Sequence, residues 1–379
     1  MPWQAHDVAA HPDFLLRVLS MLSAKSFAPG RVELLGNHTD YNGGVVLSAA
    51  THLGISAQGK TREDGKVVLT SDGIEGVSCA DLENLKPADS WSDYPLGVTQ
   101  VLKDAGYPVQ GYEADFSSTL PLGAGLSSSA ALEICTALLL SRLFNFQVDA
   151  LPLAKLARKA ENEFVGVSCG LLDQVSSVFG KKEHAIFLDC RAESVETIPF
   201  PKGVGLIIIN SGVKHALTGG EYNERRDQCF EAARIMGVPA LRDVTSEQLE
   251  AAKMPDIVKR RARHIVGENE RVFAALNFLR AGDAAGFGRL MSASHRSSIE
   301  NFENSTAELD AIVSIAQAQK GIYGARLTGG GFGGAVVALA DNDAYDRVAP
   351  IIAEEYKKAT GHTAATYRCE IGDGAILYV

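Results

Sequence analysis

The sequence predicts an α/β (α+β) protein that is divided into two lobes. Strand-like and helical patterns alternate along the first half of the chain, and helical patterns dominate after residue 220. The 379 residues are 46% hydrophobic and 22% charged, which is an ordinary globular composition. A chain of this length favours two domains, or two lobes that share one interface.

The elements of the first half follow from their spacing and their boundary residues. An amphipathic pattern predicts a helix over 13–27, and two runs joined by a turn predict strands over 54–61 and 66–71. Helical spacing predicts 94–106 and 127–144, and the serines that open the second stretch suit a helix N-terminus. The other predicted elements of this half are a strand over 111–120, a helix over 152–164 that begins with proline, and a strand over 184–190.

The second half is predicted to be mostly helical around a few strands. An apolar strand over 203–211 precedes helical patterns over 221–237, 254–282 and 306–319. The stretch 324–341 is predicted as strand, glycine loop and strand. Its glycines fit G-x-G-x-x-G, but the dinucleotide fingerprint requires a helix after the glycines, and a β-branched run follows here. The loop is either a plain hairpin or a backbone that presses against a neighbour or a ligand.

Charge and cysteine usage exclude several classes of protein. The formal net charge of −10 argues against nucleic-acid binding, and no apolar run is long enough to span a bilayer. The N-terminal residues do not have the pattern of a signal peptide. Six widely spaced cysteines without a C-x-x-C pair predict reduced thiols, and therefore a cytoplasmic protein.

Three segments contain residues suited to chemistry. The first, GRVELLGNHTDYNGG, begins at Gly30 and sets Arg31 and several short polar side chains beside the apolar residues of a strand.

The second segment, PLGAGLSSSAALE (residues 121–133, the serine-rich segment), predicts a phosphate site. Its glycines let the backbone approach a ligand, and its serines open a helix whose free N–H groups and dipole favour anions. One serine is also a candidate magnesium ligand. The alternative is a capped helix after a glycine turn, and the segment is not a Walker loop because no lysine follows the last glycine.

The third segment sets Glu161 and Asp173 on either side of a glycine-containing link. One carboxylate would hold a metal and the other would face an attacking hydroxyl. Acidic residues on helices are usually solvated, but apolar neighbours around Asp173 favour a buried carboxylate with a partner.

Taken together, these segments resemble the galactokinase family of the GHMP kinases. CGLLDQ, GGEYNERRDQC, RRARHIVGEN and GIYGARLTGG add to a resemblance that covers residues 28–340. It implies a two-lobed GHMP kinase fold with the active site between the lobes: an N-terminal mixed-sheet lobe over 1–195 and a C-terminal lobe of a sheet and helices over 196–379. The end of the chain would return to the first lobe.

The resemblance also implies roles for individual residues. Asp173 would face the anomeric hydroxyl, as a base or as an orienting group, and Arg31 would lie between it and the γ-phosphate. Ser129 and Glu161 would hold Mg²⁺, and Trp91 would stack by the adenine. The sugar would contact Asn37, His38, Thr39, Asp40, Gly170 and Tyr222. The ATP phosphates would contact Gly123, Ala124, Gly125, Leu126, Ser127, Ser128 and Ser129. The implied partners are a small sugar and ATP, with the protein a monomer or weak dimer.

Two positions depart from the family pattern. Asn37 stands where glutamate usually contacts the sugar 6-hydroxyl, and Glu33 stands where asparagine is usual. An uncharged Asn37 would tolerate a 6-carboxylate, so a kinase for a C6-modified galactose such as galacturonate is the alternative function. A non-catalytic sugar and ATP sensor is a further alternative, which the presence of Ser129 and Ala130 disfavours, as the failed fingerprint disfavours a dinucleotide oxidoreductase.

Overall fold

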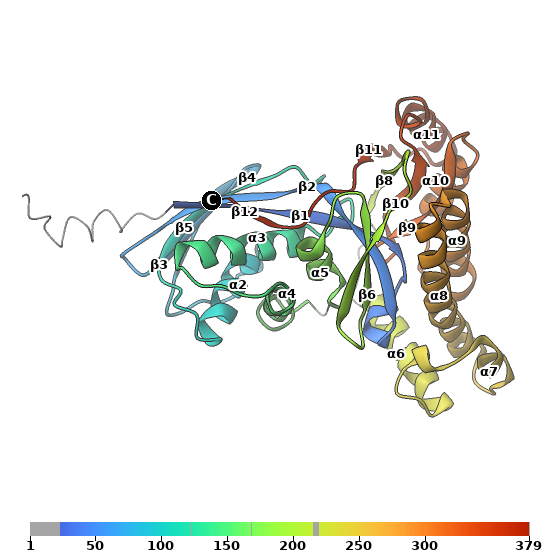
Figure 1. Cartoon of the computed structure of the whole chain (residues 1–379), viewed down its shortest axis with the longest axis horizontal. Helices are drawn as coiled ribbons and strands as arrows, with labels where there is room; N and C mark the ends of the chain where they lie inside the picture. Colours follow the sequence, from blue (N-terminus) through green and yellow to red (C-terminus); the bar gives the residue numbers. More distant parts are fainter. Residues whose placement is uncertain (1–22, 122, 168, 215–219, 379) are drawn as a thin grey trace, which may run out of the picture.

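The computed structural model describes residues 23–121, 123–167, 169–214 and 220–378, which form two lobes with one sheet each (Figure 1). The eight strands of the first sheet include a core in the order β12-β1-β2-β5-β3-β4, with β6 paired to β2 and β7 to β6. All pairings are antiparallel except β3 with β5. The strands are β1 (Ser23–Leu35), β2 (Val45–Thr61), β3 (Lys66–Ser71), β4 (Ile74–Asp81), β5 (Tyr112–Ser118), β6 (His184–Asp189), β7 (Ser194–Pro199) and β12 (Ile376–Tyr378).

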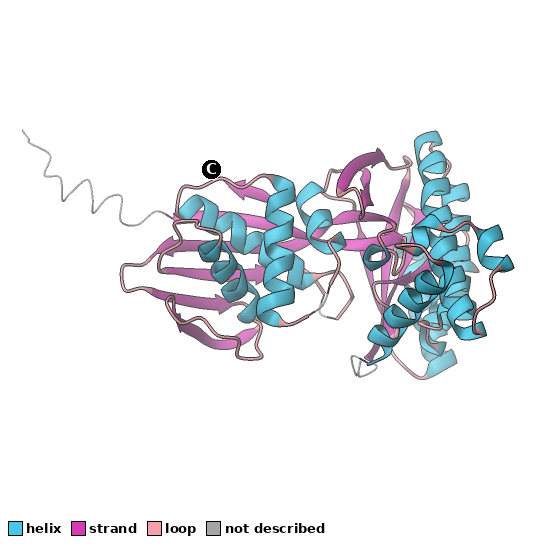
Figure 2. Cartoon of the chain, turned by 90° about the horizontal axis from the view of Figure 1, so that it is seen from below, coloured by secondary structure: helices cyan, strands magenta, loops and turns pink. Residues whose placement is uncertain are grey.

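Helices cover one face of the first sheet (Figure 2). α3 packs on β1 and β2, and its apolar residues are buried around almost its whole circumference, because α2, α4 and α5 also pack against it. Such a helix is expected in the centre of a layer. These helices are α2 (Asp93–Asp104), α3 (Ser128–Leu143), α4 (Ala150–Lys159), which continues as a π-helical turn η2 (Ala160–Val165), and α5 (Leu172–Phe179).

The second lobe is a four-stranded antiparallel sheet in the order β11-β8-β10-β9, with helices gathered on its outer side (Figure 1). Its strands are β8 (Val204–Lys214), β9 (Ile322–Thr328), β10 (Gly333–Asp341) and β11 (Ala365–Cys369). Its helices are α6 (Gly220–Met236), α7 (Ser246–Ala251), α8 (Asp256–Ala281), α9 (Ala284–Ser297), α10 (Ala307–Gln317) and α11 (Tyr345–Thr360), with short turns η3 (Leu241–Asp243) and η4 (Ser298–Phe302).

The long strands β1 and β2 extend from the first lobe to the second, where β1 contacts β9, α8 and α9 (Figure 1). The β1–β2 register shifts between Pro29 and Arg31 and again between Glu33 and Leu35. Such irregularities re-aim side chains and are common beside active sites. The turn between the two strands contains η1 (Asp40–Asn42), so the polar segment of the sequence lies where the lobes meet.

The predicted fold class is confirmed, and most of the predicted elements are present. The helix expected over 13–27 is wrong at its end, because 23–27 belong to β1 and pair with β2 and β12; residues 13–22 lie outside the described part. The chain end does return to the first sheet as β12. The lobe boundary at residue 195 stays a prediction. In the described ranges, no helix has both the length and the hydrophobicity to cross a membrane.

Candidate active site

A cavity of about 290 Å³ lies between the lobes and collects residues that the sequence predicted for the sugar and the reaction. Seven predicted residues line it: Arg31, Asn37, His38, Asp40, Gly170, Asp173 and Tyr222. Its volume is at the lower end of the range of small-molecule sites, roughly 300–1,000 Å³. The cavity therefore suits a monosaccharide better than a dinucleotide.

A larger cavity of about 710 Å³ lies along β8 and the segment 368–371. None of the predicted site residues lines it. We place the active site in the smaller cavity because it collects seven of the predicted residues, among them the paired Arg31 and Asp173.

Arg31 and Asp173 form the reactive end of the smaller cavity. The Nε of Arg31 donates to Oδ1 of Asp173 at 2.8 Å, and its Nη1 donates to the carbonyl of Gly125 at 2.7 Å. The hydroxyl of Ser127 donates to the other oxygen, Oδ2, at 2.5 Å. Both oxygens of Asp173 are thus fixed by donors from different elements, and the arginine ties β1 to the serine-rich segment.

The serine-rich segment has the geometry expected of an anion site. Gly123, Gly125 and Ser127 all have positive φ, which is the reason for glycine at the first two. Ser127 precedes α3, but its side chain does not cap that helix. The helix N-terminus therefore keeps N–H groups for a ligand, and Ser128 there is exposed. The simple capped helix is disfavoured by this arrangement.

The predicted metal ligands lie together at the base of α3. Glu161, held by the π-helical turn η2, is hydrogen-bonded to the side chain of Ser129. Gln174 Nε2 bridges the carboxylates of Glu161 (2.7 Å) and Glu133 (3.0 Å). Burial raises the pKa of Glu133 to about 10, and the charge of Glu161 adds to the effect. Glu133 and Gln174 were not predicted from the sequence.

The donor set is compatible with Mg²⁺. A carboxylate and a hydroxyl are hard oxygen ligands, and Mg²⁺ typically takes one or two carboxylates and completes its shell with phosphate and water. Among the described residues, no group of three or more His, Cys, Asp or Glu side chains is arranged to hold a metal alone. Among the described residues, one Oε of Glu133 is buried without a hydrogen-bond partner.

The turn from β1 to β2 (residues 36–44, the polar loop) forms one wall of the cavity. His38 has a positive φ of 62°, and its Nε2 lies 2.9 Å from the carbonyl of Gly330 while its Nδ1 lies 2.8 Å from the Tyr41 hydroxyl. Because a carbonyl only accepts, we assign the proton to Nε2. Burial lowers the pKa of His38 to about 4, so the ring is neutral.

Asp40 and Gly170 are in direct contact. A Cβ added to Gly170 would lie only 1.9 Å from Oδ2 of Asp40, which explains the glycine at this position. Burial raises the pKa of Asp40 to about 6, and the charges of Glu33 and Asp173 act in the same direction. Thr39 differs from these residues. Its buried hydroxyl lies 2.8 Å from the carbonyl of Gly36 and 2.7 Å from that of Val45, at the two ends of the polar loop, and it does not line the cavity.

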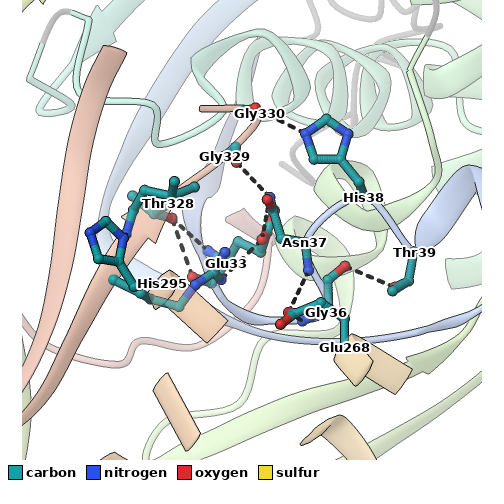
Figure 3. Close-up of polar contacts among 12 residues, drawn as sticks. Glu33, Gly36, Asn37, His38, Thr39, Glu268, His295, Thr328, Gly329 and Gly330 are labelled. Carbon is teal, nitrogen blue, oxygen red and sulfur yellow. Dashed lines mark hydrogen bonds and ion pairs between the residues drawn. The ribbon is translucent and has the colours of Figure 1, made fainter. Parts of the chain in front are cut away.

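The side chain of Asn37 is held entirely by the protein (Figure 3). Its Nδ2 donates to Glu33 Oε1 at 3.0 Å and to the Gly329 carbonyl at 2.8 Å, and its Oδ1 accepts from Asn304 Nδ2 at 2.9 Å. The residue is 1% exposed. Glu33 also accepts from Arg326 Nη1 at 3.0 Å. The two positions that depart from the family pattern therefore contact one another.

Glu268 is a further residue of the site that lacked a predicted role. From α8, its Oε2 accepts from the N–H groups of Gly36 (2.9 Å) and Asn37 (3.0 Å), while Oε1 accepts from Arg271 at 2.6 Å. Although burial opposes it, the charge of Arg271 holds the pKa of Glu268 well below its usual range. The sequence signal was the stretch RRARHIVGEN, which contains this residue.

The aromatic residues of the site divide between two places. Tyr222, on α6, packs its ring 5.1 Å from that of His38 and lines the cavity. Trp91, just before α2, packs edge-on against Phe116 at 6.0 Å and is not part of the cavity wall.

Comparisons with known proteins agree with the geometry. The GHMP kinases N terminal domain matches residues 93–181, the GHMP kinases C terminal domain matches 274–358, and the galactokinase galactose-binding signature matches 23–60. The chain is 41% identical to a galactokinase of Thermotoga neapolitana over 92% of this chain and 98% of that protein. It is 40% identical to a galactokinase of Haemophilus influenzae over 92% and 93% of the two chains.

Solved structures show the same similarity. The crystal structure of Lactococcus lactis galactokinase complexed with galactose has a TM-score of 0.90 and 36% identity, covering 93% of this chain and 95% of that one. Methanococcus jannaschii mevalonate kinase, at 20% identity over 93% and 99% of the two chains and a TM-score of 0.66, shares the fold.

Proposed function

The chain belongs to the galactokinase family of the GHMP kinases, and from this premise we infer that it transfers the γ-phosphate of ATP to the anomeric hydroxyl of galactose. The observation that carries this inference is the arrangement of Arg31, Asp173 and Ser127 at the end of a sugar-sized cavity, beside a helix N-terminus with free N–H groups. A kinase for a C6-modified galactose is disfavoured, because the curated relatives are galactokinases and because the carboxylate of Glu33 lies beside Asn37.

Phosphoryl transfer needs positioning and charge neutralisation more than covalent chemistry. Asp173, fixed on both oxygens, accepts the hydrogen bond and then the proton of the anomeric hydroxyl. Arg31 supplies positive charge between that hydroxyl and the transferred group, where negative charge collects. The N–H groups and serines at the start of α3, together with Gly123–Leu126, bind the ATP phosphates.

Ser129 and Glu161 would hold Mg²⁺, with Gln174, which also contacts Glu133, orienting Glu161. When bound, the ion neutralises charge on the phosphates. The sugar contacts His38, Asp40, Gly170 and Tyr222, while Asn37 forms part of the wall and Thr39 stabilises the polar loop, and neither contacts the sugar. Stacking of Trp91 near the adenine, a monomeric or weakly dimeric state and a cytoplasmic location remain predictions.

A coupled ADP-release assay with ATP, Mg²⁺ and a panel of hexoses tests the function. We expect turnover with galactose, with the product identified as the 1-phosphate. Galacturonate is the matched comparison, since it differs from galactose only at C6. Failure to consume ATP with any galactose-configured sugar would refute the inferred activity, and faster turnover of galacturonate would return the C6-modified alternative.

A further inference from the structure

Glu33 is the third carboxylate in the cavity lining, beside Asp173 and Asp40, and the proposed function assigns it no role. It lies on the same strand as Arg31, two residues further on, so both side chains point to the same side of β1, about 7 Å apart along the strand. Both line the cavity. Arg31 marks the end where the phosphoryl group is transferred, and Glu33 therefore lies toward the opposite end of a bound sugar.

The protein holds the Glu33 carboxylate by one oxygen only. Oε1 accepts from Asn37 Nδ2 and from Arg326 Nη1, each at 3.0 Å (Figure 3 shows the Asn37 contact). Within the described part of the chain, we find no hydrogen bond to Oε2. Glu33 is 5% exposed and Arg326 is fully buried, so the small exposed part of this ion pair faces the cavity.

Asn37 is unsuited to reading the sugar itself. Both N–H groups of its amide are used by Glu33 and Gly329, and its oxygen accepts from Asn304. With both donors used and the residue 1% exposed, the amide has only the second lone pair of Oδ1 left for a substrate hydroxyl, and this neutral acceptor is weaker than the carboxylate of Glu33. Its contacts instead orient the neighbouring carboxylate.

We propose that Glu33 is the specificity-determining carboxylate of this chain: its free oxygen accepts a hydrogen bond from a sugar hydroxyl on the C4–C6 side, and Asn37 holds it in position. The proposal rests on the proposed function. A carboxylate acceptor gives a charge-assisted bond, which is stronger than a bond to a neutral group. The charge also repels a carboxylate at that end of the substrate.

The test combines the variant Glu33→Gln with deoxy sugars. Loss of a charge-assisted hydrogen bond corresponds to about 10- to 100-fold in kcat/KM. We expect Glu33→Gln to lower kcat/KM for galactose by that factor and to leave either 4-deoxygalactose or 6-deoxygalactose almost unchanged, since one of them lacks the hydroxyl concerned. The control is 2-deoxygalactose, whose missing hydroxyl is next to C1, and which should lose as much as galactose.

The exchange variant Glu33→Asn/Asn37→Glu keeps the composition and charge of the chain. It moves the carboxylate from position 33 to position 37, and the two positions are joined by a hydrogen bond. It should recover part of the preference for galactose over the affected deoxy sugar that Glu33→Gln loses. Each comparison is the ratio of kcat/KM for two sugars on the same preparation, so a fraction of unfolded protein does not change it. If Glu33→Gln does not fold, Glu33→Asp replaces it. Equal losses with all sugars would overturn the proposal and leave Glu33 a structural residue. Inactivity of the unmodified protein with every sugar would instead refute the proposed function.

Discussion

Replacing Gly170 with alanine should lower kcat/KM for galactose through a single steric contact, the one with Asp40. The added methyl would lie 1.9 Å from Oδ2 and 2.8 Å from Cγ of Asp40, distances that real Cβ atoms do not adopt. Gly170 does not have a positive φ, so alanine is acceptable to the backbone and the effect is confined to the contact. The Asp40 carboxylate must move away, and loss of its charged hydrogen bond to the sugar costs about 10- to 100-fold in kcat/KM.

The assay is kcat/KM for galactose, with KM and kcat separated, since the role proposed for Asp40 is to bind the sugar and not to react. We expect most of the loss in KM. Gly220→Ala is the matched control, because a Cβ at Gly220 meets no atom of the described residues within 4 Å. Thermal melting of both variants verifies that the fold is intact.

A double-mutant cycle decides whether the effect passes through Asp40. In an Asp40→Ala background the two clashing atoms are gone, and only the Cβ of residue 40, at 3.1 Å, remains near the new methyl. Gly170→Ala should then cost almost nothing further. If instead it costs the same factor in both backgrounds, the reasoning from this contact is refuted and Gly170 acts in another way.

Three further predictions concern the same cavity. Asp173→Asn should lower kcat by roughly 10² or more, because the proton acceptor is lost, while calorimetry still detects galactose binding; near-normal turnover would remove Asp173 from the mechanism. The raised pKa of Asp40 is about 6, so kcat/KM for galactose should fall as the pH drops below 6, because the carboxyl gains a proton and loses an acceptor there. Asp40→Asn should abolish that inflection in the pH profile. Asn37→Glu should lower the free energy of unfolding by about 2 kcal/mol or more, since it replaces a donor to Glu33 with a second carboxylate. Denaturant titration measures this loss, and adding Glu33→Asn should restore part of the stability.

Elements with a strong local pattern could be predicted from the sequence, and elements defined by distant partners could not. The long helix α8 (Asp256–Ala281) and the apolar strand β8 follow from periodicity alone. Residues 23–27 were misassigned because their alternating burial acquires its meaning from pairing with β2 and, for residues 25–27, with β12, some 350 residues later. Helix α9 was missed because its two glycines and three serines weaken its helical preference, and contacts with α8 and β9 stabilise it.

The same division applies to the site. Arg31, His38 and Asp40 were identified because they lie within one short segment that also resembles a family pattern. The environment of Asn37 could not be predicted from the sequence, since its partners Asn304 and Gly329 lie 267 and 292 residues away along the chain. The sequence therefore raised the question of C6 tolerance at position 37, and the contacts with distant residues changed its answer.

The second lobe holds the sugar site of the first lobe in place by satisfying its buried backbone. Where the chain leaves β1 for the polar loop, the N–H groups of Gly36 and Asn37 have no strand partner, and a buried N–H without an acceptor is costly. One oxygen of Glu268, from α8, accepts both, and Arg271 compensates its charge. Because the loop and its acceptor belong to different lobes, separating the lobes would leave these two N–H groups without their acceptor. The wall that contacts the sugar is thereby fixed before the sugar arrives, which is the condition for orienting its hydroxyl toward Asp173.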